Sequence, residues 1–128
     1  MNSDNRILSE LGQIGVTVSD VEKSVSFYRD TLGLKHLFSA PPGLAFFAAG
    51  AVRLMLSRPE KPESERFTSA LYFKVADIQG TRDSLASRGV IFETEPLRVA
   101  KMPDHELWMA FFRDPDRNLL GLMCEKRA

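Results

Sequence analysis

The amino-acid sequence predicts an α+β fold built from two βαβββ modules in tandem. Two stretches, "QIGVTVSDVEKSVSFYRDTLGL" at 13–34 and "ALYFKVADIQGTRDSLASRGV" at 70–90, each contain an alternating strand, a Val-x-Asp motif and a helical pattern that ends at glycine. Each stretch is followed by three short strand-like segments. A charged segment with two prolines, "RPEKPESERF", separates the halves. The predicted order is therefore βαβββ, linker, βαβββ.

The first module is predicted at residues 8–58. Its first strand starts at Gln13, and Asp20 suits the helix N-cap, where a carboxylate accepts the free amide hydrogens of the first turn. Gly33 suits the left-handed position that ends many helices. Four residues have the spacing of one helix face: Val21, Val25, Tyr28 and Leu32. Strands are then predicted at 35–40, 44–50 and 52–57, with proline and glycine between them.

The second module is predicted at residues 68–125, after a linker at 59–67. Asp77 occupies the N-cap position of its helix, and Gly89 ends that helix. Three strands are predicted at 90–99, 106–113 and 119–125. The last two are joined by "DPDRN", whose residue types are typical of a tight turn. The chain, 1–128, is therefore predicted to be a single domain of two similar halves.

Composition and charge limit the possible classes of function. The chain has 128 residues, of which 44% are hydrophobic and 27% are charged, as in soluble globular proteins. Lys+Arg and Asp+Glu each number 17, so no net charge favours a nucleic acid or an anionic membrane as partner. The one cysteine, Cys124, cannot form an internal disulfide, and no signal peptide or membrane-spanning run is visible. These features predict a cytoplasmic protein that binds neither nucleic acid nor membrane.

Two stretches resemble a known group of proteins. "VTVSDVEKSVSFYRDTLGL" and "FFRDPDRNLLGLM" are similar to the vicinal oxygen chelate superfamily, which includes glyoxalase I, bleomycin-resistance proteins and extradiol dioxygenases; the resemblance extends from about residue 8 to residue 125. In the second stretch Arg117 replaces the glycine of the usual Asp-Pro-Asp-Gly-Asn turn. The resemblance implies a glyoxalase-like fold, in which curved mixed sheets surround a cavity, and a homodimer.

The resemblance also implies four positions for metal ligands, one on the first and one on the last strand of each module. Because alternate residues of a strand share a face, these positions can be assigned to residues. They hold Gln13, Met55, Ala70 and Gly121. One amide and one thioether are a poor donor set for zinc, nickel or iron, and alanine and glycine have no ligand atom. We predict a degenerate site with no metal and no other cofactor, and a divalent metal is the alternative that the family implies.

Side chains predicted on the same strand faces indicate a ligand pocket. The predicted ligand-binding residues are Gln13, Arg53, Met55, Tyr72 and Trp108. The rings and the thioether would provide apolar surface, and Arg53 or Lys74 would anchor a ligand carboxylate. The alternative for Trp108 is a contact in the core or in a dimer interface.

His105 is the candidate for acid–base catalysis, with Glu106 as its partner. It lies between Asp104 and Glu106, and a histidine near carboxylates could act as a general base because negative charge favours its protonated form. The alternative is a solvated loop histidine.

The sequence supports two hypotheses of function. The first is a metal-independent small-molecule-binding protein, similar to bleomycin-resistance-type proteins that hold a ligand between two subunits. The second is a glyoxalase-like lyase or isomerase, or a dioxygenase-type enzyme, that acts on a small oxygenated substrate through an atypical metal site or through His105. The two hypotheses differ in whether the chain is an enzyme at all.

Overall fold

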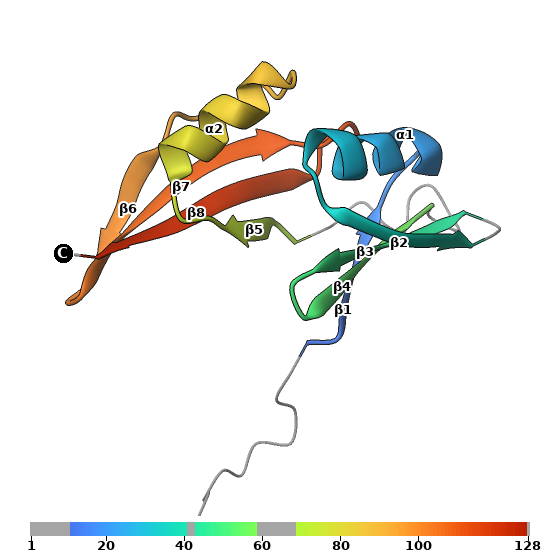
Figure 1. The fold of residues 1–128 in the computed structure, drawn as a ribbon, viewed down its shortest axis with the longest axis horizontal. Coiled ribbons are helices and arrows are strands. Elements are labelled where there is room, and N and C mark those ends of the chain that lie inside the picture. Colours follow the sequence, from blue (N-terminus) through green and yellow to red (C-terminus); the bar gives the residue numbers. More distant parts are fainter. Residues whose placement is uncertain (1–10, 41–42, 59–68, 128) are drawn as a thin grey trace, which may run out of the picture.

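The computed structural model describes residues 11–40, 43–58 and 69–127, and it confirms two βαβββ modules in tandem (Figure 1). The first module contains β1 (Gln13–Thr17), α1 (Val21–Ser26), the π-helical turn η1 (Phe27–Thr31), β2 (Lys35–Ala40), β3 (Leu44–Ala49) and β4 (Val52–Ser57). The second contains β5 (Leu71–Lys74), α2 (Ile78–Ser87), β6 (Leu97–Lys101), β7 (His105–Arg113) and β8 (Leu119–Arg127). The predicted linker at 59–67 lies outside the described residues.

Each module forms one four-stranded mixed sheet. The strand order is β1-β4-β3-β2 in the first sheet and β5-β8-β7-β6 in the second, with the first and last strands of each module parallel. Both helices lie on the same side of the sheets (Figure 1). Apolar side chains at alternate strand positions pack beneath the helices and form the core, which includes Val16, Phe47, Leu54, Leu56, Phe112, Leu120 and Leu122. Each sheet therefore has one face covered by a helix and one face that no helix of the described residues covers.

The helices begin and end where the sequence predicts. Asp20 and Asp77 cap them, accepting backbone N–H groups at 3.1 and 3.0 Å, and Gly33 and Gly89 follow with positive φ angles of 77° and 96°. The first helix differs in one respect, because its second half winds as a π-helix over residues 27–31. No helix of the described residues is long and apolar enough to span a lipid bilayer.

The prediction of a strand at 90–99 is the main point at which the fold differs from what the sequence predicts. The structure starts β6 only at Leu97, and in the preceding segment Phe92 makes an isolated bridge to Phe112. Pro96 gives the reason, since proline has no N–H to donate to a strand ladder. The turn at 114–118 forms as predicted, and Arg117 adopts the left-handed conformation, with φ of 71°.

The turn at 114–118 also joins the two modules. Asp114 is only 4% exposed, and its Oδ2 accepts a 2.8 Å hydrogen bond from the hydroxyl of the fully buried Tyr28. Asp116 Oδ1 accepts from the backbone N–H of Ser19 at 2.9 Å, and Asn118 Nδ2 donates to the carbonyl of Thr17 at 3.0 Å. Burial, with the Asp114 carboxylate as a further cause, raises the pKa of Tyr28 far above its ordinary value. The second module therefore contacts η1, the end of β1 and the segment before α1 through polar bonds, of which the bond between Tyr28 and Asp114 is buried.

Candidate functional site

The side of the two sheets opposite the helices, which we call the open face, carries most of the predicted ligand-binding residues. In β4, Leu54 and Leu56 point into the core, so Arg53 and Met55 point away from it. The register pairs Gln13 with Arg53 across these parallel strands. We define the open face by Gln13, Phe38, Phe46, Arg53, Met55, Tyr72, Phe111 and Gly121.

Gln13 and Arg53 form a bonded pair on the first sheet. Arg53 Nε donates a 2.7 Å hydrogen bond to Gln13 Oε1, and the guanidinium carbon lies 5.1 Å from the centre of the Phe46 ring. Gln13 Nε2 lies 3.6 Å from Met55 Sδ. Phe38 stacks on Phe46 with 4.6 Å between the ring centres. Three of the five predicted ligand-binding residues are thus brought together, next to two phenylalanine rings.

On the second sheet, the open face carries Tyr72, Phe111 and Gly121. The rings of Tyr72 and Phe111 meet edge to face, with centres 6.1 Å apart. A Cβ atom placed on Gly121 would lie 2.9 Å from Tyr72 Cδ1 and 3.3 Å from Phe111 Cδ1, which is too close. Glycine at this position of β8 therefore allows the two rings to pack over the strand.

The residues at the four implied metal positions do not fit a metal ion. The amide oxygen of Gln13 already accepts from Arg53, and this guanidinium would repel a cation at the same place. Ala70 and Gly121 offer no ligand atom, and the ring of Tyr72 takes the space that a longer side chain at position 121 would need. Across residues 11–40, 43–58 and 69–127, no three His, Cys, Asp or Glu side chains gather into a group that could hold a metal ion.

Trp108 lies on the helix side of the second sheet, not on the open face. It pairs with the buried Cys124 in the register of β7 and β8, and it packs against the core. Its Nε1 donates to Glu106 Oε1 at 3.1 Å, and Lys126 Nζ lies 4.0 Å from the centre of its ring. Trp108 and the fully buried Phe112 are four residues apart on one strand, so they share a face. Trp108 thus has the core contact that the sequence left as its alternative.

The structure does not bring His105 and Glu106 together. They are successive residues of β7 and point to opposite faces: His105 Nδ1 lies 2.8 Å from Asp104 Oδ1, whereas Glu106 accepts from Trp108. Asp104 Oδ2 also accepts from Arg127 at 2.7 Å. The pKa of the Asp104 carboxyl is lowered, mainly by the hydrogen bond with His105, and that of Glu106 is lowered mainly by the bond from Trp108. The start of β7 lies at the end of the second sheet away from the first module (Figure 1).

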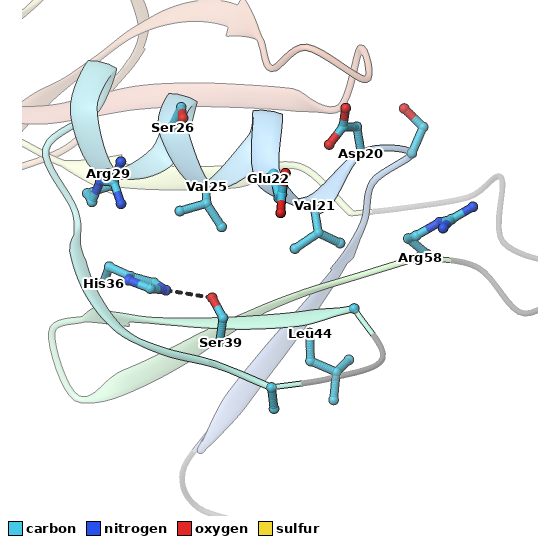
Figure 2. A pocket seen from close by; sticks show the side chains of 13 residues that line it. Asp20, Val21, Glu22, Val25, Ser26, Arg29, His36, Ser39, Leu44 and Arg58 are labelled. Carbon is cyan, nitrogen blue, oxygen red and sulfur yellow. Dashed lines mark hydrogen bonds between the residues drawn. The ribbon is translucent and has the colours of Figure 1, made fainter.

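A cavity of about 870 Å³ lies on the helix side of the first sheet, between α1 and the strands β2 and β3 (Figure 2). His36 and Ser39 line it, with His36 Nε2 at 2.9 Å from Ser39 Oγ. Arg29 lines it as well and is paired with Asp30 at 2.7 Å, while Asp20 caps α1. Because these polar groups already bond to neighbours in the chain, this cavity provides a weaker case for a ligand than the open face does.

The stacked pair Phe38 and Phe46 was not predicted from the sequence. The strand predicted at 44–50 was not divided into its two faces. The signal was present, because Phe46 lies between two residues that are fully buried in the core, Ala45 and Phe47, and alternation turns it to the other face.

Two tandem βαβββ modules with a shared open face define a glyoxalase-like class of protein. The chain belongs to the Glyoxalase/Bleomycin resistance protein/Dioxygenase superfamily, whose family model matches residues 10–122.

Individual relatives agree with this membership. The chain is 35% identical over 129 residues to the uncharacterized protein YraH of Bacillus subtilis (strain 168), an alignment that covers 88% of this chain and 96% of the relative. Its fold is similar to that of TnmS3, an antibiotic binding protein from Streptomyces sp. CB03234, with a TM-score of 0.75, 26% identity, and coverage of 95% of this chain and 100% of TnmS3. A lactoylglutathione lyase from Agrobacterium tumefaciens also has a TM-score of 0.75, at 19% identity, with coverage of 93% of this chain and 96% of the lyase. At this level of identity, the similarity shows a common fold alone.

Proposed function

We propose that this protein binds a small organic molecule without a metal ion, in a cavity that two copies form by bringing their open faces together. The observation that supports this proposal is the composition of the open face. At the positions where the family binds metal, the side chains have poor ligand atoms or none, but aromatic side chains lie around them. Phe38 is 48% exposed and Tyr72 is 47% exposed in the single chain. Exposed apolar surface of this kind is typical of interaction surfaces and ligand grooves.

The likeness to TnmS3 supports binding rather than catalysis. That protein is an antibiotic binding protein, and it matches the present chain over nearly the full length of both. Fold similarity alone would be a weak argument, since one fold hosts many functions. The poor donor set of Gln13, Met55, Ala70 and Gly121 is an independent reason to favour binding over metal-dependent chemistry.

Elemental analysis of the purified protein, followed by addition of nickel, zinc, iron or manganese, tests the metal-independent part. We expect less than stoichiometric metal, and no increase in thermal stability when a metal ion is added. One tightly bound ion per chain would overturn the proposal and favour the lyase or dioxygenase alternative.

A thermal-shift screen of small organic molecules tests the binding part. A ligand present at about 100 times its Kd raises the free energy of unfolding by about 2.7 kcal/mol, which such a screen detects. Tyr72→Ala should weaken the stabilisation by any ligand that is found. Ile91→Ala is a matched control, because Ile91 is 86% exposed but lies outside the open face. If no compound in a chemically broad set stabilises the protein, the proposed function is wrong.

Light scattering after size-exclusion chromatography tests the dimer. We expect the mass of two chains for the native protein and of one chain for Phe38→Glu, because the variant replaces an exposed apolar ring of the open face with a charge that must lose its water in the interface. Ile91→Glu should remain dimeric. His105→Ala should leave ligand binding unchanged, whereas a turnover reaction abolished by this variant would favour an enzyme.

A further inference from the structure

We propose that Gln13, Arg53 and Phe46 form a clamp for the carboxylate of a planar aromatic acid. This inference names the chemical class of the ligand and therefore rests on the proposed function. It goes beyond the apolar character of the open face, because it assigns a charge, a shape and an orientation to the bound molecule.

Arg53 is held in place but is not neutralised. A guanidinium has five N–H donors, and Arg53 uses the one on Nε for Gln13. Among the described residues, neither Nη nitrogen has a hydrogen-bond acceptor, and no Asp or Glu carboxylate pairs with Arg53. The two Nη groups form a planar fork that matches the two oxygens of a carboxylate. The charge and the geometry of Arg53 thus both fit an organic anion.

Gln13 orients Arg53 without cancelling its charge. The amide oxygen accepts from Nε at 2.7 Å, which fixes the guanidinium beside β1 and leaves both Nη groups without an acceptor among the described residues. A glutamate would have nearly the same shape and could accept the same bond, but its negative charge would pair with the guanidinium. The neutral amide therefore leaves the positive charge available to a ligand, which gives a physical reason for an amide at this position.

The surface beside Arg53 is flat and aromatic. The guanidinium lies over the ring of Phe46, which is only 9% exposed, and Phe38 stacks on Phe46 while remaining 48% exposed. Met55 adds a polarisable thioether on the same face. An aromatic ring attached to the carboxylate can pack against Phe38 and Met55 while the carboxylate meets Arg53.

Isothermal titration calorimetry of the full chain with three probes of one shape tests the charge preference. The probes are 2-naphthoate, the neutral 2-naphthalenemethanol and the cationic 2-naphthylmethylamine. We expect naphthoate to bind roughly tenfold to a hundredfold more tightly than the alcohol, as one charge-assisted contact allows, and the amine to bind more weakly than the alcohol. Equal affinities for the acid and the alcohol would overturn the clamp but leave the proposed function intact. The same conclusion would follow if none of the three probes binds while other small molecules do.

Variants of the clamp test the assignment to Arg53. Arg53→Met should reduce the affinity for naphthoate to that for the alcohol, and Gln13→Glu should reduce it roughly tenfold or more while the affinity for the alcohol stays the same. Arg29→Met is the control arginine, from the cavity beside α1, and should have no effect. Unchanged naphthoate binding in Arg53→Met overturns the proposal. Dissociation of the dimer in that variant also overturns it, because Arg53 would then pair with a carboxylate of the partner subunit.

Discussion

Replacing Tyr28 by phenylalanine measures what the buried bond between the modules contributes to stability. The ring stays and only the hydroxyl is lost, so no large cavity forms. Asp114 keeps three other donors: the backbone N–H groups of Asp116 and Asn118, at 2.9 and 2.8 Å, and Asn118 Nδ2 at 2.8 Å. One buried hydrogen bond to a charged group is therefore lost, and its contribution is about 1.5–3 kcal/mol.

Urea unfolding of the native chain and of Tyr28→Phe checks this magnitude. Tyr72→Phe is the matched control, because the structure gives the Tyr72 hydroxyl no hydrogen bond to a described residue and the ring is 47% exposed. The control should lie within about 0.5 kcal/mol of the native chain, as most surface substitutions do. Equal losses in the two variants, or a loss below about 0.5 kcal/mol in Tyr28→Phe, would refute the reasoning that this bond stabilises the contact between the modules.

The same variant changes the dependence of stability on pH. The folded state raises the pKa of Tyr28, so the folded chain keeps the phenol proton above about pH 10, where an unfolded tyrosine loses it. The unfolded state then binds fewer protons, and the free energy of unfolding falls as pH rises, by up to about 1.4 kcal/mol per pH unit from this group. Between about pH 10 and pH 11, the free energy of unfolding of Tyr28→Phe should therefore fall less steeply with pH than that of the native chain. An identical slope in both proteins would show that Tyr28 ionises equally in the two states.

Three further substitutions test single positions, each by urea unfolding. Gly121→Ala should destabilise the chain by about 1 kcal/mol because its Cβ meets Tyr72, and the loss should shrink when Tyr72→Ala is added; additive losses would contradict the clash. Arg117→Gly should stabilise the chain by up to about 1 kcal/mol, since φ is 71° at this residue, and a measured loss would contradict backbone strain at this position. Asp77→Ala should cost about 1 kcal/mol through loss of the helix cap, and a neutral result would mean that the 3.0 Å bond to the backbone of Gly80 contributes nothing.

Local patterns allowed the sequence to predict most of the secondary structure. Asp20 and Asp77 cap their helices as expected, because an N-cap depends on residues within one turn of it. Alternation correctly placed Leu54 in the core and Arg53 outside it, since the period of a strand is a local property. The strand expected at 90–99 was too long because the effect of Pro96 on the ladder was not weighed.

The site was predicted less completely than the fold. Because alternate residues of a strand share a face, one surface was predicted to hold Gln13, Arg53 and Met55. In the structure Gln13 contacts both of the others. Trp108 was chosen for its residue type, and because it lies four residues before Phe112 on one strand, it falls on the helix side and packs against the core. His105 was chosen for its acidic neighbours in the chain, but adjacent residues of a strand point to opposite faces, and this separates it from Glu106.

The sequence by itself determined the two modules, the helix ends and the two faces of β4, because each depends on short-range periodicity or on the identity of one residue. Only the tertiary structure decided which residues meet across strands and modules. It stacked Phe46 on Phe38, placed Gln13 against Arg53 and joined Tyr28 to Asp114, which is 86 residues away. Such contacts depend on strand order and module packing, which no local pattern in the chain encodes.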